Sequence, residues 1–340
     1  MRNNSITIAR VLSMLMIVGC HVANWMGIAP IAQLLNVGVE IFLVISGFLY
    51  SNKSIKKPLE FISGRWKKVM IPLYLIALFV AVEHIFIDGC FESLKNFGIY
   101  VVGMQGLPVM VIGMHVPGYI ELAQTWFLTP LLICYALLLI YKRFVEWRCN
   151  HNSILVYAGV AIFLCCLDIC LLLLWGLQIG YIFIFFLGYF VGKRMDEWNK
   201  KSNCNKSETI LTIVMVFAVI VRLLCREYAD DSVLYEQFVA IFSHAVIAVW
   251  FVQTIQYIEQ KRPRLIETVA SYRIIIWLDK NSFYIYLTHY MFFFGILSID
   301  NLNLSIIAKC LWLVVGTIVM TVILGKSVEI IDRLFFAKRS

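Results

Sequence analysis

The chain has 340 residues, of which 61 % are hydrophobic and only 15 % are charged, with a formal net charge of +8. Soluble domains contain roughly 45–50 % apolar and about 25 % charged residues, so this composition excludes a soluble globular protein, a disordered chain and a nucleic-acid-binding module. One membrane-spanning helix needs about 20 apolar residues. The composition therefore predicts a membrane protein with many spans and no separate soluble domain.

Ten apolar runs predict an all-α integral membrane protein with about ten transmembrane helices, because backbone groups in lipid must hydrogen-bond within their own segment. We expect one domain over residues 1–340. The uncharged stretch 154–192 is too long for one crossing and divides at Trp175-Gly176. The predicted spans are approximately 6–27, 36–51, 69–88, 125–142, 154–173, 175–192, 208–224, 235–258, 282–299 and 304–325.

The distribution of basic residues predicts the orientation. With the N-terminus inside, all but four of the 29 lysines and arginines fall in the inner segments, and the exceptions are Lys95, Arg222, Arg226 and Lys309. The positive-inside rule then places both termini in the cytoplasm. The segment 99–117 is apolar but is interrupted by glycine and proline, so we expect an outer loop that dips into or lies on the membrane.

Two ionisable residues of the first span lie on one helical face. Arg10 is near the inner end and His21 in the outer half. Eleven residues make three turns plus about 20°, which separates them by about 16.5 Å along the axis. Arg10 alone also fits an interfacial anchor, and His21 alone also fits a hydrogen-bonded packing residue. Because ionisable groups in spans are costly, the shared face favours a functional polar path.

The second span adds the carboxylate of Glu40. If the chain turns near residue 31, Glu40 and His21 reach a similar depth in an antiparallel helix pair. A carboxylate beside an imidazole fixes its tautomer and raises its basicity, as a general base requires. The alternative is a solvated Glu40 at the outer interface.

Basic residues precede the third span in Arg65-Trp66-Lys67-Lys68, and Pro72 is expected in the first turn of the following helix. Such charges obey the positive-inside rule, but a cluster of them also suits the phosphates of a cytoplasmic nucleotide or cofactor. Trp126, at the outer start of the fourth span, fits an aromatic belt.

Other polar residues within the predicted spans remain open between function and packing. Ser282, Tyr286 and His289 share one face of the ninth span, where His289 also fits a hydrogen-bonded core residue. Glu83 and His84, near the outer end of the third span, fit either the outer part of a site or the interface. Asp168 lies in the fifth span without an evident partner.

Five motifs follow one another along the chain: Arg10…His21, Gly38-Val39-Glu40…Ser46-Gly47-Phe48-Leu49, Arg65…Lys68 with Pro72-Leu73-Tyr74, Trp126-Phe127-Leu128 and Ser282…Tyr286-Leu287-Thr288-His289. In this order and spacing they resemble the membrane-bound acyltransferase-3 family, which includes bacterial O-acetyltransferases of exopolysaccharide, lipopolysaccharide and peptidoglycan. The resemblance extends over essentially the whole chain, and the length fits the short stand-alone type.

The resemblance implies transfer of an acetyl group from cytoplasmic acetyl-CoA to a hydroxyl of a cell-surface or lipid-linked glycan, at the bacterial plasma membrane. His21 is similar to the family's catalytic histidine, a general base or a transient acyl carrier, and Glu40 fills the position of a family carboxylate. Arg10, Arg65 and Lys68 match basic residues that meet the acyl-CoA donor. Motif positions without an assigned role are Ser46, Trp126, Ser282, Tyr286 and His289.

A transporter or flippase of a glycan or small metabolite is the competing interpretation, because it too would bury polar residues among about ten spans. The halves show no two-fold similarity, which favours the enzyme. The expected partners are acetyl-CoA, a glycan or glycolipid acceptor and membrane lipid; we expect neither a metal ion nor nucleic acid. The acceptor, the acyl group, the oligomeric state, an acyl-histidine intermediate and a Cys90–Cys225 pairing all stay open.

Overall fold

The computed structural model describes residues 3–89, 91–107, 115–143, 180–200, 204–229 and 239–335, and positions 159, 160, 162–164, 166, 167 and 170. The chain forms two units. Unit 1 comprises Met1–Ile55 and Ile140–Lys280, and unit 2 comprises Lys56–Leu139 and Asn281–Ser340. All regular elements in these described ranges are helices, as the sequence predicts.

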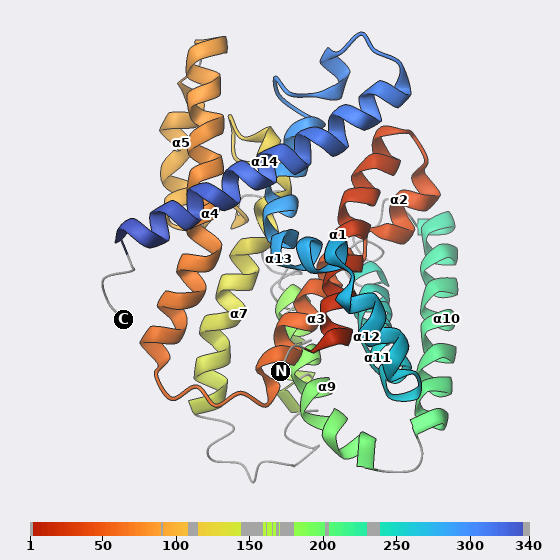
Figure 1. Cartoon of the computed structure of the whole chain (residues 1–340). Coiled ribbons are helices and arrows are strands. Elements are labelled where there is room, and N and C mark those ends of the chain that lie inside the picture. Colours follow the sequence, from red (N-terminus) through yellow and green to blue (C-terminus); the bar gives the residue numbers. More distant parts are fainter. Residues whose placement is uncertain are drawn as a thin grey trace. The chain divides into compact units, whose positions relative to one another are not determined.

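Unit 1 contains the N-terminal helices and a group from the second half of the chain (Figure 1). Its elements are α1 (Asn4–Trp25), α2 (Ala29–Leu35), α3 (Gly38–Ser51), α9 (Gly180–Lys200), α10 (Cys204–Ala229), α11 (Ala240–Lys261) and α12 (Pro263–Ser271). Helix α3 packs against α1, α9 and α11, and α10 packs against α11.

Unit 2 contains the longest helices of the described part. Its elements are α4 (Pro58–Asp88), α5 (Glu92–Val101), the 3₁₀ helix η1 (Ile120–Phe127), α7 (Leu128–Tyr141), the 3₁₀ helices η4 (His289–Phe292) and η5 (Ile299–Asn301), and α14 (Ile306–Phe335). Helix α13 (Arg273–Thr288) begins in unit 1 and continues into unit 2. Within unit 2, α4 packs against α5 and α14.

Seven helical segments of the described ranges are long and apolar enough to cross a membrane: Asn4–Trp25, Ala29–Ser51, Pro58–Ile87, Ile120–Tyr141, Glu208–Cys225, Ala240–Lys261 and Ile306–Phe335. Each overlaps a predicted span. The predicted span 154–173, its division from the next at Trp175-Gly176, and Asp168 lie largely or wholly outside the described residues. A total of about ten spans and the cytoplasmic placement of both termini stay predictions.

Two of these helices show the exposed apolar surface expected beside lipid. No residue in the apolar window Glu208–Cys225 of α10 is buried, and only 17 % of the corresponding window in α14 is buried. Phe217 is 65 % exposed and Ile307 is 71 % exposed. Such surface is unfavourable in water by about 25 cal/mol per Å², so lipid tails are the solvent that suits these faces.

Helix α1 begins after a side-chain cap, Asn3. The side-chain oxygen of Asn3 accepts a hydrogen bond from the backbone N–H of Ile6 at 3.1 Å, which satisfies one of the unpaired donors of the first turn. The helix then continues without interruption to Trp25. Arg10 and His21 therefore lie on one continuous helix, and their predicted common face follows from its geometry.

Glycines allow α3 and α9 to approach closely. A Cβ atom at Gly47 would overlap the carbonyl oxygen of Phe185, and a Cβ atom at Gly188 would overlap that of Val44. Small residues at helix contacts are typical of membrane proteins, in which close backbone packing drives association. The glycine of the Ser46-Gly47 motif thus has a packing role, and Ser46 beside it is half-buried in α3.

The predicted ninth span, 282–299, is wrong as a continuous helix. Helix α13 ends at Thr288, η4 follows, and Gly295 adopts a left-handed conformation with φ 79°. The side chain of Ser298 then donates to the carbonyl of Phe293 and accepts from the N–H of Asp300. The segment is largely apolar, so its composition suggests a span although the α-helix ends at Thr288.

The position of Pro72 also differs from the prediction. Helix α4 starts at Pro58, where the missing N–H is tolerated, so Pro72 lies in the helix interior instead of its first turn. The charged stretch before residue 69 lacks the hydropathy of a span but still continues the same helix. For the expected outer loop 99–117, the structure shows that α5 ends at Val101, and residues 108–114 lie outside the described ranges.

Candidate functional site

The predicted site residues fall in both units. His21, Glu40, Arg10 and Ser46 belong to unit 1, whereas Arg65, Lys68, Trp126, Ser282, Tyr286 and His289 belong to unit 2. His21 lies in the last turns of α1 and is partly buried. On the stripe between His21 and Arg10, Ser13, Met14 and Ile17 are buried.

Arg10 is held by an ion pair inside unit 1. Its Nη1 atom donates to Oδ1 of Asp279 in α13 at 2.7 Å, and the hydroxyl of Thr7 donates to Oδ2 of the same carboxylate at 3.3 Å. The side chains of Arg10 and Asp279 are 30 % and 14 % exposed. Sequence analysis did not single out Asp279. The pair fixes the guanidinium at the N-terminal part of α1.

Glu40 is paired with a histidine that sequence analysis did not select. Oε1 of Glu40, in the first turn of α3, lies 2.9 Å from Nδ1 of His244 in α11, and both residues are buried. The second carboxylate oxygen of Glu40 and Nε2 of His244 have no hydrogen-bond partner among the described atoms. A histidine inside the predicted span 235–258 was the available signal, since ionisable residues in spans are functional candidates.

Helix α2 determines beside which part of α1 Glu40 lies. A Cβ atom on Gly19 would contact Leu35 at 3.0 Å, and one on Gly38 would lie 2.7 Å from the carbonyl oxygen of Ser13. As the chain advances from residue 35 to 38, its neighbour on α1 changes from residue 19 to about residue 15. The α3 helix is therefore antiparallel to α1 and begins partway along it.

This register corrects the expectation that His21 and Glu40 share one depth. Two residues beyond Gly38, the backbone of Glu40 lies roughly 10 Å from the level of His21 along α1, at 1.5 Å per residue. The expectation assumed a simple turn near residue 31, but the link contains α2, which returns beside α1 (Figure 1). A direct role of Glu40 on His21 stays a prediction.

The basic residues before the third predicted span lie on the first turns of α4 in unit 2. Arg65 is half-buried, and its guanidinium carbon is 5.9 Å from the centre of the Phe61 ring, within the range of a cation–π contact. Lys68, three residues later, is exposed. Both therefore lie on one helix, with Arg65 packed against an aromatic ring and Lys68 accessible.

A second buried polar cluster lies in unit 2 around η1. Nε2 of His84 is 2.9 Å from Oε1 of Glu121, which is 2 % exposed. The hydroxyl of Tyr286 donates to the carbonyl oxygen of Gln124, and the Gln124 amide donates to the carbonyl of Leu287 at 3.1 Å. Glu121 and Gln124 are the functional candidates that sequence analysis missed here, because nothing in the apolar pattern marks the irregular start of this span.

The remaining predicted positions in unit 2 join this cluster through packing. Nδ1 of the buried His289 donates to the carbonyl of Tyr286 at 2.9 Å. The ring of Tyr286 packs edge-on against Phe127, and the partly buried Trp126 also lies edge-on to Phe127. Ser282 is buried on α13. His289 thus has the contacts of a hydrogen-bonded core residue, and a functional role for Ser282, Tyr286 and His289 stays a prediction.

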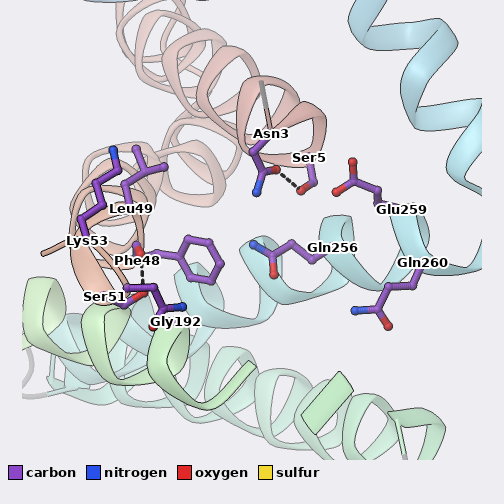
Figure 2. A pocket seen from close by; sticks show the side chains of 11 residues that line it. Asn3, Ser5, Phe48, Leu49, Ser51, Lys53, Gly192, Gln256, Glu259 and Gln260 are labelled. Carbon is purple, nitrogen blue, oxygen red and sulfur yellow. Dashed lines mark hydrogen bonds between the residues drawn. The ribbon is translucent and has the colours of Figure 1, made fainter. Parts of the chain in front are cut away.

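A polar pocket of about 530 Å³ opens at the end of unit 1 where α1 begins and α3 and α11 end (Figure 2). Its buried floor includes Ser5, Ser51 and Gln256, while Asn3 and Lys53 are exposed at its rim. Figure 2 shows the amide of Gln256 in the middle of the lining residues, directed toward the side that Phe48 forms. The remaining lining residues are Leu49, Asn52, Gly192, Glu259 and Gln260.

This pocket brings together segments that the charge distribution predicts to share one side of the membrane. They come from the start of α1, the end of α3, α9 near Gly192 and the end of α11.

Cys90 lies outside the described residues, so a Cys90–Cys225 pairing stays open. Among the described residues, no group of three His, Cys, Asp or Glu side chains is placed to hold a metal ion.

Residues 3–326 match the family model of an acyltransferase domain, acyltransferase-3. No curated protein and no solved structure matches the chain significantly.

Proposed function

The chain belongs to the acyltransferase-3 family, and we propose on this basis that it is a membrane O-acetyltransferase. It moves an acetyl group from cytoplasmic acetyl-CoA to a hydroxyl of a cell-surface or lipid-linked glycan, at a bacterial plasma membrane. A membrane acyltransferase follows from the family and the apolar helices. The observation that supports the finer proposal best is the uninterrupted helix α1, which holds Arg10 and His21 on one face.

The transfer needs a base at the acceptor hydroxyl. In the proposed step, a ring nitrogen of His21 takes the hydroxyl proton while the hydroxyl oxygen attacks the thioester carbonyl carbon. The new C–O bond forms as the C–S bond breaks, and the leaving thiolate then takes up the proton. In the alternative route, a ring nitrogen of His21 attacks the thioester carbonyl carbon, and a C–N bond forms as the C–S bond breaks and CoA leaves as the thiolate. The acceptor hydroxyl oxygen then attacks the acetyl carbon, the C–N bond breaks as the C–O bond forms, and the thiolate takes up the hydroxyl proton.

Glu40 supports this chemistry from the same helix pair. His21 becomes positively charged in either route, and in this proposal the carboxylate on the neighbouring helix, roughly 10 Å away at the level of the backbone, stabilises that charge through the low-dielectric interior. The carboxylate is held in place by His244, which occupies one of its oxygens. In this proposal, the second oxygen of Glu40 accepts a hydrogen bond from the acceptor hydroxyl or from a water molecule.

Basic residues bind the donor in this proposal. Arg65 and Lys68 contact phosphates of acetyl-CoA from α4, and Arg10 contributes positive charge on the helix that carries His21. Because Arg10 already pairs with Asp279, its proposed contact with the donor uses guanidinium N–H groups beyond the one that donates to Asp279. A guanidinium has five such donors, so both contacts are compatible.

The experiment is acyl transfer in membranes with radiolabelled acetyl-CoA. We expect label in the glycan fraction with the wild type, and no label with His21→Ala at equal protein in the membrane. The matched control is His115→Ala, because His115 is an exposed histidine in a loop of unit 2. Wild-type transfer by His21→Ala would remove His21 from the mechanism, and absence of transfer by the wild type would contradict the proposed donor and acceptor.

A further inference from the structure

We propose that the pocket between the start of α1 and the ends of α3 and α11 binds the headgroup of a zwitterionic phospholipid that carries a primary ammonium group, the class of phosphatidylethanolamine. The inference goes beyond the proposed function, because it assigns a lipid site and leaves the acyl-transfer chemistry unchanged. It rests on the place of the pocket in the fold, on two opposite charges in its lining and on a buried amide without a partner.

The pocket lies where three candidate membrane spans end. These spans are Asn4–Trp25, which begins at the pocket, and Ala29–Ser51 and Ala240–Lys261, which finish there. The ends of spans lie at the boundary between hydrocarbon and water, where lipid headgroups are found. Phe48 and Leu49 line the pocket about one turn before the end of α3, whereas Lys53 just beyond α3 is exposed. The pocket is therefore at headgroup level and has both an apolar and a polar side.

Two opposite charges lie across the pocket from each other. Figure 2 shows the side chains of Lys53 and Glu259 on opposite sides of Gln256. Within the described part of the chain neither of them forms an ion pair, and Nζ of Lys53 lies 5.2 Å from the centre of the Tyr50 ring. A lysine suits phosphate oxygens and a carboxylate suits an ammonium group. A zwitterion satisfies both residues, whereas a purely anionic headgroup is repelled by Glu259.

The buried amide of Gln256 lies between these two charges. Gln256 is 6 % exposed, and its amide nitrogen has no hydrogen-bond partner among the described atoms. An unpaired buried donor is unfavourable, and an acceptor oxygen from a ligand removes this penalty. A phosphodiester has more than one acceptor oxygen, so Lys53 and Gln256 can both bind it while the ammonium group reaches Glu259.

The lining favours a primary ammonium group over choline. A primary ammonium has three N–H donors for a carboxylate, whereas proteins bind quaternary ammonium groups in cages of aromatic rings. Phe48 is the single aromatic side chain among the described lining residues, so they form no such cage. The volume of about 530 Å³ lies within the usual range for small-molecule pockets, roughly 300–1,000 Å³. It holds a headgroup while the acyl chains stay in the bilayer.

The test is native mass spectrometry of the purified chain in detergent, with equal amounts of phosphatidylethanolamine, phosphatidylcholine and phosphatidylglycerol that share the same acyl chains. We expect the wild type to retain phosphatidylethanolamine about fivefold or more over the other two. Glu259→Lys should reverse the preference toward phosphatidylglycerol, because it replaces the partner of the ammonium by a second cation. Lys53→Gln and Gln256→Leu should each weaken retention of phosphatidylethanolamine, because each removes a donor to the phosphate.

The matched control is Glu267→Lys, which makes the same change of charge at an exposed position of α12 outside the pocket lining. This variant should keep the wild-type order of the three lipids. A reversed preference in Glu259→Lys requires a folded site, so loss of the fold cannot imitate it. The soluble headgroup, glycerophosphoethanolamine, is added as a competitor, and we expect it to displace the lipid only in large excess.

Equal retention of the three lipids by the wild type would overturn the proposal. A preference that Glu259→Lys leaves unchanged, or that Glu267→Lys reverses to the same extent, would overturn it as well, because the discrimination would then come from outside the pocket. Displacement of the lipid by an equal concentration of glycerophosphoethanolamine would assign the pocket to a soluble zwitterion and contradict a lipid site.

Discussion

Oε1 of Glu40 and Nδ1 of His244 lie 2.9 Å apart inside unit 1 and join α3 to α11. Removing either partner leaves a buried polar group without its hydrogen bond, and for a carboxylate this penalty is large. Replacing both partners by uncharged side chains removes the buried charge together with the bond. The pair therefore predicts a strong coupling between substitutions at the two positions.

We expect His244→Ala to destabilise the protein by about 3–5 kcal/mol, because it leaves the Glu40 carboxylate buried and unpaired. The double substitution His244→Ala with Glu40→Gln should recover part of this loss. The measurement is the thermal unfolding midpoint of the four proteins of the cycle in one detergent. Midpoint changes that simply add would show that the two side chains do not interact.

Arg10 allows structure and donor binding to be separated. Asp279→Asn removes the charge of the ion pair but leaves the guanidinium in place, so it should lower the unfolding midpoint slightly, by about 1 kcal/mol or less for a partly exposed pair. Arg10→Ala removes the same ion pair and also the proposed donor contact. We expect a raised KM for acetyl-CoA only in Arg10→Ala. Equal KM values in the two variants would restrict Arg10 to the ion pair.

Replacing two glycines by alanine should have opposite effects on stability, because only one of the two lies in the contact between α3 and α9. Gly47→Ala places a methyl group against the backbone of Phe185, so the helices must separate, at a cost of about 1–3 kcal/mol. A Cβ atom at Gly64, on α4, would have nothing within 4 Å. Gly64→Ala should therefore be neutral or stabilising by up to about 1 kcal/mol, from helix propensity. The unfolding midpoints of both variants test this, and equal changes would contradict the close packing.

The sequence predicted the helices that local chemistry determines. The apolar run predicted a span over 6–27, within two residues of α1 at each end, and the common face of Arg10 and His21 follows from 3.6-residue periodicity. The segment 282–299 is also largely apolar, but α13 ends at Thr288, and η4, the turn at Gly295 and the side-chain bonds of Ser298 give the remaining residues another conformation. Hydropathy measures transfer to lipid and does not register such local hydrogen bonds.

The candidate site was harder to predict, because it depends on how helices meet. The sequence marked Glu40 as a carboxylate in a predicted span, but its partner His244 is 204 residues away. The position of Glu40 along α1 depends on α2, which is too short to appear as a separate element in a hydropathy pattern. The partner of Arg10 was missed for the same reason, since Asp279 lies on a helix from the other end of the chain.

Variants of Tyr286 and His21 should differ in their effects on stability and on transfer rate. Tyr286 carries a buried hydroxyl that hydrogen-bonds within unit 2, whereas His21 carries the imidazole proposed to act in catalysis. The hydroxyl of Tyr286 donates to the carbonyl of Gln124, and the amide of Gln124 donates back to the carbonyl of Leu287. Tyr286→Phe leaves one buried carbonyl without its donor, which costs about 1–3 kcal/mol. We expect a lower unfolding midpoint and a transfer rate that falls only in proportion to the amount of folded protein.

His21→Ala should behave in the opposite way. His21 is only partly buried near the end of α1, so its replacement should change the unfolding midpoint little. Loss of a general base costs about 10²–10⁴-fold in rate, and loss of an acyl carrier abolishes that route entirely. The transfer rate per folded molecule, measured with both variants, separates the two roles. A rate per folded molecule that falls as far in Tyr286→Phe as in His21→Ala would place the Tyr286 hydroxyl in the chemistry rather than in the packing of unit 2.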